Sequence, residues 1–340
     1  MEHRIHHVSK RLAKNHDVTV LTSQLPDSSS EEMIDGYAVK RLPSKYIDIY
    51  NPPYVTTPGL EEALASLRPD VVDFHYRWSP SYNKLARKYA GKKVFTFHNT
   101  YGEGVGITRL PSLINDRLWK PHLGRFDRIV CVSEFVRADL EARGVDRNRL
   151  VAIPNGIECR PNVDDIREDD FILFVGRLVN TKGLPYLVRA MQDIDTKLVI
   201  CGGGPEEDRL RKLVNKLGLQ QKVELAGKVS EERKVELMST CKLFVMPSIF
   251  ESYGIAVAEA MSYGKAIVAS DVGGLPEVVR DAGLLAMAKD PKDLAEKVNT
   301  LLHDDKDRMK KAVRAAQCSQ EYEWDTIADK MNLLYSDLAE

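Results

Sequence analysis

Residues 246–277, MPSIFESYGIAVAEAMSYGKAIVASDVGGLPE, contain the residue types best suited to chemistry in this chain. Glu251 and Glu259 stand on either side of a glycine-led helix start at 252–255. Because a helix N-terminus carries unpaired N–H groups and partial positive charge, it can bind a phosphate. A carboxylate one or two turns further on can accept hydrogen bonds from hydroxyls, as an acidic residue does with ribose. The segment therefore suits a nucleotide that carries a sugar.

The eight-residue spacing of the two glutamates is weak evidence alone, because Glu224 and Glu232 repeat it. Either member of the first pair would then be an ordinary solvated helix residue. The context favours a site: the pair follows the strand-like run LFVMPS, Gly254 stands at the tip of the turn, and small residues allow a close approach of helix to sheet.

A second block, FVGRLVNTKG at 174–183, places two cations after a predicted strand that ends at Gly176. Arg177 offers a planar fork and Lys182 a point charge, and together they can hold a diphosphate. Surface salt bridges are the alternative for an isolated pair. The presence of the glutamate block favours the diphosphate.

Two further strand ends carry candidate residues. CGGGPEEDRL at 201–210 has the pattern of a helix cap, and its glycines, including Gly203, would let a ligand approach the backbone. TFHNTYG at 96–102 places His98 at the end of a strand, where we expect it to face a cleft. For this histidine a structural and a catalytic role both stay open.

Strand-like runs alternate with helical patterns along both halves of the chain, which predicts parallel α/β sheets covered on both faces. We expect two doubly wound, Rossmann-like domains that face each other across a central cleft. The predicted domains are residues 1–159 and 171–321, joined by a polar linker at 160–170, with an amphipathic helix at 322–340 that packs back on the first domain. Predicted strands lie at 18–23, 38–42, 71–76, 93–99, 128–133, 150–155, 171–177, 197–203, 223–228, 243–248, 266–270 and 283–287.

Composition is that of a soluble globular protein, with 43% hydrophobic and 29% charged residues and a net charge of −1. The first 158 residues hold 23 Lys and Arg against 19 Asp and Glu, so the first half is mildly basic. The chain has no strongly basic domain, so its composition does not predict nucleic-acid binding. Five scattered cysteines indicate reduced, buried thiols in a cytoplasmic protein. The basic amphipathic segment at 109–126 allows a peripheral membrane contact, although ordinary packing on its own domain is favoured.

These blocks, with HDVTVLT, VSEFVRADL and IPNGI in the first half, resemble the retaining glycosyltransferases of family 4 (glycosyl transferases group 1), which have the GT-B fold. The resemblance covers essentially the whole chain from about residue 5 and is most specific in the second half. It implies the transfer of a sugar from a nucleotide-diphospho-sugar, with a UDP- or GDP-sugar expected, to a hydroxyl of a glycan, lipid-linked or small-molecule acceptor. It also implies a reaction without metal or other cofactor.

The resemblance also assigns roles to single residues. Arg177 and Lys182 would neutralise the leaving diphosphate, Glu259 would bind the ribose, and Glu251 would contact the hydroxyls of the donor sugar. The donor phosphate and sugar would be held by backbone amides of Tyr253, Gly254 and Ile255. His98 would lie beside the reacting sugar. Gly176 and Gly203 would line the donor site, and Lys228 and Val229 would lie near the base.

One departure from the family is that the sequence starts after the first strand and glycine-rich loop that such chains normally have. We expect both to be absent here, either because the given start is internal to a longer natural chain or because the protein lacks them. Two alternatives to transfer follow. One is a catalytically inert protein that binds a sugar nucleotide, and the other is a non-hydrolysing sugar-nucleotide epimerase, which shares the two-domain fold. The paired cation and glutamate blocks favour transfer over the epimerase, and the inert protein requires that the N-terminal strand and loop are truly missing.

Overall fold

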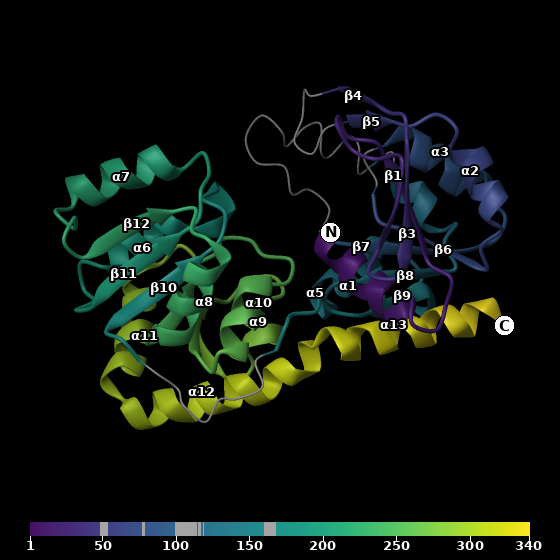
Figure 1. Cartoon of the computed structure of the whole chain (residues 1–340). Coiled ribbons are helices and arrows are strands. Elements are labelled where there is room, and N and C mark those ends of the chain that lie inside the picture. Colours follow the sequence, from purple (N-terminus) through teal and green to yellow (C-terminus); the bar gives the residue numbers. More distant parts are fainter. Residues whose placement is uncertain (48–53, 77–78, 99–113, 115–116, 118, 160–167) are drawn as a thin grey trace. The chain divides into compact units, whose positions relative to one another are not determined.

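The computed structural model describes residues 1–47, 54–76, 79–98, 114, 117, 119–159 and 168–340 (Figure 1). The chain divides into two compact units. The N-terminal unit comprises residues 1–155 together with 324–340, and the C-terminal unit comprises residues 156–323. Most of the predicted linker at 160–170, and much of the basic segment at 109–126, lie outside the described residues.

The C-terminal unit is a six-stranded, all-parallel sheet in the order β12-β11-β10-β13-β14-β15. Its strands are β10 (Phe171–Val175), β11 (Lys197–Cys201), β12 (Val223–Gly227), β13 (Leu243–Met246), β14 (Ala266–Ser270) and β15 (Gly283–Ala286). Its helices are η3 (Asn180–Lys182), α6 (Leu184–Ala190), α7 (Glu207–Lys216), α8 (Glu231–Thr240), α9 (Ile255–Ser262), α10 (Leu275–Val279), α11 (Pro291–His303), α12 (Asp305–Ser319) and η4 (Gln320–Tyr322).

Helices cover both faces of this sheet, as the near-continuous apolar runs of its strands predict. All residues of β13 and β14 are buried. α11 packs against α6, and α12 packs against α9 (Figure 1). The six strands predicted in this half are confirmed, with ends that differ by up to two residues.

The N-terminal unit contains a parallel sheet, β6-β7-β8-β9, and a separate three-stranded sheet, β1-β3-β2. Its strands are β1 (Thr19–Ser23), β2 (Glu31–Ile34), β3 (Tyr37–Leu42), β4 (Lys45–Ile47), β5 (Tyr54–Thr56), β6 (Val71–Phe74), β7 (Lys92–Phe97), β8 (Arg128–Cys131) and β9 (Leu150–Ala152). Its helices are α1 (Glu2–Leu12), α2 (Leu60–Leu67), α3 (Pro80–Lys88), α5 (Glu134–Ala142), η2 (Arg147–Arg149) and α13 (Trp324–Ala339).

Three features of this unit differ from the sequence prediction. The strand predicted at 150–155 ends at Ala152, where a loop with Pro154 begins. The antiparallel strand β2 was not predicted, because its EEMI sequence is exposed and lacks apolar alternation. The short hairpin of β4 and β5 was also missed.

The C-terminal helix α13 builds the core of the N-terminal unit together with α1 (Figure 1). The two helices and strands β7 and β8 share one apolar cluster, in which Trp324, Ile327 and Met331 are almost fully buried. Burial of each such side chain stabilises the fold by about 1.5–3 kcal/mol. The last helix of the chain is therefore part of the structure that positions the ends of β6 and β7.

Candidate active site

The sequence segments predicted to form the site in the second half of the chain lie at the carboxyl ends of the strands of the C-terminal sheet. Strand order reverses between β10 and β13, because the chain runs outward from β10 to β12 and then returns to β13 on the other side. In open α/β sheets ligands bind beside the carboxyl ends of the strands at such a switch point. The loop after β10 carries Arg177 and Lys182, and the loop after β13 carries Glu251.

An ion pair joins these two loops: the Lys182 ammonium donates to the carboxylate of Glu251. The two side chains are only 19% and 14% exposed, so solvent screens the pair less than a surface pair. The hydroxyl of the buried Ser248 lies 3.4 Å from the same carboxylate oxygen. The structure thus brings together two predicted residues that are 69 positions apart.

Glycines allow the loops to approach each other backbone to backbone. A Cβ on Gly183 would lie 2.0 Å from the carbonyl oxygen of Pro247, and one on Gly273 would lie 1.8 Å from that of Glu251. On the other side, a Cβ on Gly202 would lie 1.9 Å from the carbonyl oxygen of Gly176. Each distance excludes any side chain, so these glycines fix the loops of β11, β10, β13 and β14 against one another.

Arg177 and Lys228 are exposed cations at the same sheet edge. Within the part of the chain that the structure describes, neither side chain has a hydrogen bond or ion pair. The alkyl chain of Lys228 lies over Gly203, where a Cβ would come within 3.1 Å of the lysine Cε. Val229 follows Lys228 and is half-buried. These side chains can take up an anionic or planar ligand without breaking an existing ion pair.

The start of α9 has the features expected of a phosphate site. Gly254 is its N-cap, with φ +108°, and no described side chain caps the helix. Tyr253 is buried and packs edge-on to Tyr322, whereas Ile255 is 45% exposed. Glu259, one turn further on, is half-buried.

Lys234 of α8 is a neighbour of Glu259 that the sequence reasoning did not single out; its Nζ lies 3.8 Å from the Glu259 carboxylate. Burial alone would lower the pKa of Lys234, but the hydrogen bond to Glu231 and the charge of Glu259 outweigh it and raise that pKa. Nothing in the spacing of VSEERKVEL distinguishes this lysine from a surface residue. The contact depends on how α8 packs beside α9.

His98 follows β7 in the N-terminal unit and contacts a second histidine. Its Nε2 lies 3.1 Å from Nδ1 of His75, and Nε2 of His75 lies 3.5 Å from the carboxylate of Asp73. Asp73 and His75 were within a predicted strand but were not identified as site residues. Their alternation in VVDFHY, which places both on one face at the strand end, is the signal that could have found them.

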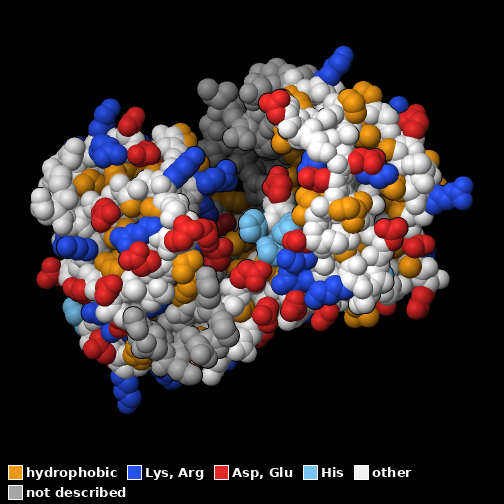
Figure 2. All heavy atoms as spheres, viewed as in Figure 1, with side chains coloured by type: hydrophobic (Ala, Val, Ile, Leu, Met, Phe, Trp, Pro, Cys, Tyr) orange, Lys and Arg blue, Asp and Glu red, His pale blue; other side chains and the backbone are white. Residues whose placement is uncertain are grey.

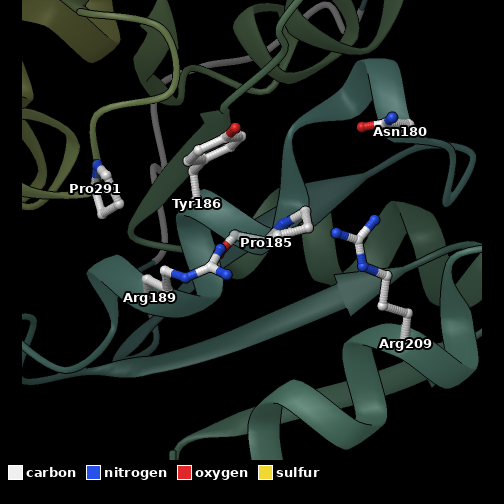
Figure 3. Close-up of a pocket in the computed structure, with 6 residues that line it drawn as sticks. All are labelled: Asn180, Pro185, Tyr186, Arg189, Arg209 and Pro291. Atoms are coloured by element: carbon white, nitrogen blue, oxygen red, sulfur yellow. The ribbon is translucent and has the colours of Figure 1, made fainter.

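A separate pocket of about 210 Å³ opens between α6, α7 and the start of α11 (Figure 3). Its two arginines are engaged locally: Arg189 donates to the carbonyl of Pro185, at 2.9 Å, and Arg209 pairs with Glu206, also at 2.9 Å. None of the predicted site residues lines it. The pocket is lined by Asn180, Pro185, Tyr186, Arg189, Arg209 and Pro291.

The described residues contain no helix that is both long and apolar enough to cross a membrane. They also contain no group of three or more His, Cys, Asp or Glu side chains placed to hold a metal ion.

Comparison with known proteins agrees with this architecture. The family model for Glycosyltransferase Family 4 matches residues 1–160, and that for Glycosyl transferases group 1 matches residues 160–319. Among solved structures, sucrose-phosphate synthase from Thermosynechococcus elongatus superposes with a TM-score of 0.81 at 24% identity, covering 97% of this chain and 91% of that one. A likeness at this identity shows the GT-B fold.

Curated relatives are similar over much of the chain. Phosphatidyl-myo-inositol mannosyltransferase from Mycobacterium leprae is 30% identical over 79% of this chain and 74% of its own length. The phosphatidylinositol N-acetylglucosaminyltransferase component from Arabidopsis thaliana is 27% identical over 98% of this chain and 78% of its own. An uncharacterized glycosyltransferase of Methanocaldococcus jannaschii is 32% identical, and the match spans 60% of its length. The chain belongs to glycosyltransferase family 4, the glycosyl transferases group 1, and has the two-domain α/β fold of that family.

Proposed function

We propose that this protein is a retaining glycosyltransferase that moves a sugar from a nucleotide-diphospho-sugar to an acceptor hydroxyl without a metal ion. The observation that carries the proposal is the Lys182–Glu251 pair at the switch point of the C-terminal sheet. It places a cation and a carboxylate beside the uncapped start of α9. The cation and the helix start can bind a diphosphate, and the carboxylate can bind the hydroxyls of a sugar.

In this proposal Arg177 and Lys182 stabilise the negative charge that gathers on the departing diphosphate. Amides of Tyr253, Gly254 and Ile255 bind the donor phosphate and sugar. Preorganised cations and amides of this kind need no rearrangement as the charge develops, and each contributes about 10²–10³ in rate. Glu251 binds hydroxyls of the donor sugar, and His98 lies beside the reacting carbon.

The nucleoside would occupy the rest of the same sheet edge. Glu259 accepts hydrogen bonds from the ribose, and Nζ of Lys234 lies 3.8 Å from its carboxylate. Gly176 and Gly203 lack side chains that would block the ligand, and Lys228 and Val229 lie near the base. A UDP- or GDP-sugar is the proposed donor; one structural neighbour, HepE of Anabaena, was solved with UDP and glucose.

The acceptor in this proposal is a glycan, lipid-linked or small-molecule hydroxyl, and the protein works in the cytoplasm with a peripheral membrane contact through its N-terminal unit. Two relatives are named for transfer to phosphatidylinositol lipids. Phosphatidylinositol in vesicles is therefore the first acceptor to test, with free myo-inositol as the soluble counterpart. Sedimentation with vesicles of anionic and of neutral lipid tests the membrane contact.

Donor binding and turnover are measured together. A thermal-shift panel of UDP-, GDP- and ADP-sugars identifies the donor, because a ligand that binds only the folded state raises its apparent stability. Proton NMR of the first product formed from an α-linked donor then shows whether the α configuration is kept, and EDTA should leave the rate unchanged. Binding without turnover would indicate an inert sugar-nucleotide-binding protein. Release of an epimerised sugar would indicate an epimerase.

A further inference from the structure

His98 and four further side chains of the N-terminal unit form a connected network. His98 and His75 are joined at 3.1 Å, and Nε2 of His75 faces the Asp73 carboxylate at 3.5 Å. The network continues beyond Asp73 to Thr96 of β7 and Tyr335 of α13. It thus connects the end of β7 with a helix more than 230 positions later in the sequence.

Asp73 accepts hydrogen bonds from two hydroxyls. The hydroxyl of Tyr335 donates to its Oδ2 at 2.6 Å, and the hydroxyl of Thr96 donates to the same oxygen at 2.8 Å. Burial, together with the charge of Asp73, raises the pKa of Tyr335 well above its usual value, so this hydroxyl keeps its proton and remains a donor.

The charge of Asp73 determines where the neighbouring protons lie. Burial lowers the pKa of His75, against the opposing charge of Asp73, so the ring is neutral near pH 7 and has one N–H. Its Nε2 lies 3.5 Å from the carboxylate, which favours a proton on that nitrogen because the negative charge would repel a lone pair there. Nδ1 of His75 is therefore an acceptor, and the proton between the two rings belongs to Nε2 of His98.

We propose that Asp73 and His75 are positioning residues for His98, and that Tyr335 supports them from the C-terminal helix. They hold the His98 ring in one orientation and keep its proton on Nε2, which leaves Nδ1 as the acceptor nitrogen in its neutral form. A carboxylate behind a histidine also stabilises the ring when it becomes positively charged. The consequence for turnover rests on the proposed function, whereas the placement of the protons does not.

Nuclear magnetic resonance of the ¹⁵N-histidine-labelled full chain tests the proton placement directly. We expect a coupling between Nε2 of His98 and Nδ1 of His75 across the shared hydrogen, with the hydrogen bonded to His98. Asp73→Asn removes the charge, so a second state with the hydrogen on His75 becomes populated. Tyr335→Phe, which deletes one hydroxyl, should shift the same signals less. A hydrogen on Nδ1 of His75 in the wild type, or signals unchanged in Asp73→Asn, would overturn the proposal.

Kinetics with the best donor of the UDP-, GDP- and ADP-sugar panel test the consequence. Asp73→Asn should lower kcat by roughly 10–100-fold while KM for the donor changes by less than about threefold, because a positioning residue acts on the reacting group and not on donor binding. Tyr89→Phe is the matched control, because that hydroxyl donates to the carbonyl of Pro69, outside the network, at 3.3 Å. An unchanged kcat in Asp73→Asn contradicts the role in turnover. A wild type that turns over no donor contradicts the proposed function instead.

Discussion

Lys182 donates to Glu251 across the switch point of the C-terminal sheet, and this pair connects the loops after β10 and β13. The lysine is the cation that the proposed reaction places on the leaving diphosphate. It is already held by a partner whose own proposed role is to bind the donor sugar. The cation is thus oriented before the donor arrives, which is the condition for electrostatic catalysis without rearrangement.

Lys182→Ala should therefore lower kcat by about 10²–10³ and change donor affinity much less, because the charge it stabilises develops in the transition state. Steady-state rates and a donor titration by calorimetry measure the two quantities separately. Lys212→Ala, at an exposed position on α7, is the control for loss of a lysine from the same unit. An equal loss in donor affinity and in kcat/KM would assign Lys182 to ground-state binding alone.

The close backbone contact between the loops leads to a second prediction, which concerns Gly183. Its φ is +64°, and a Cβ would lie 2.0 Å from the carbonyl oxygen of Pro247. Gly218 has nearly the same φ, +69°, with nothing within 4 Å of the added Cβ. Gly218→Ala should cost about 1–2 kcal/mol, from the left-handed backbone alone.

Gly183→Ala carries that cost and the steric clash, so we expect it to destabilise the C-terminal unit by about 3–5 kcal/mol, the range of severe single mutations. Urea unfolding of both variants measures the difference. The stability that Gly183→Ala loses beyond the loss in Gly218→Ala measures the loop contact separately from the backbone strain. Equal midpoints for the two variants would show that the loops can separate at no cost.

Much of this architecture could be predicted from the sequence because its signals are local. Buried parallel strands such as β13 and β14 are continuous apolar runs, and Ser133, just before α5, caps that helix with its hydroxyl 3.1 Å from the amide of Val136. Of the five cysteines predicted to be buried thiols, Cys159 is half-buried and the other four are buried: Cys131, Cys201, Cys241 and Cys318. Hydrophobic periodicity, helix caps and turn residues can be recognised in a sequence without knowledge of its tertiary contacts.

Contacts that arise only from tertiary packing could not be predicted in this way. Tyr335 is one residue of an amphipathic helix, and nothing in the neighbouring sequence indicates that its hydroxyl reaches Asp73. Lys234 likewise meets Glu259 only because two helices pack side by side. The pairing of Lys182 with Glu251 also depends on tertiary packing, because the two residues are 69 positions apart in the sequence.

Arg4 of α1 is a buried cation that ties three segments of the N-terminal unit together. It is 1% exposed, and Nη1 donates to the carbonyl oxygens of Ile153 and Pro154, at 3.2 and 2.6 Å. Nη2 lies 3.4 Å from the sulfur of Met331 in α13. Arg4→Ala leaves buried carbonyls unpaired and opens a cavity.

We expect Arg4→Ala to lower the free energy of unfolding by about 2–5 kcal/mol, which combines lost hydrogen bonds with lost packing. Thermal unfolding followed by tryptophan fluorescence measures it, because Trp324 lies in the affected core. Lys14→Ala, just after α1 and exposed, is the control and should stay within about 0.5 kcal/mol of the wild type. A loss no larger than that of the control would mean that water replaces the guanidinium.

Histidines gathered on α1 predict that acid weakens the N-terminal unit (Figure 2). His7 stacks on Trp324 with ring centroids 4.7 Å apart and planes 6° from parallel. Burial, then the charges of His3 and His6, lower the pKa of His7 to about 4, with smaller effects of Arg11 and Lys10. Its ordinary value is 6.5.

Because the folded pKa is the lower one, the unfolded chain binds more protons between about pH 6.5 and pH 4, so stability falls as pH decreases through this window. Burial lowers the pKa of His75 as well, which adds to the effect in the same direction. Urea unfolding at pH 7.5 and pH 5.0 should give a lower midpoint at pH 5.0. His7→Phe keeps the stacking and removes the charge, so the difference between the two midpoints should shrink. His303→Phe, at an exposed position on α11, should leave that difference unchanged, and a His7→Phe variant with the full wild-type difference would contradict the assignment.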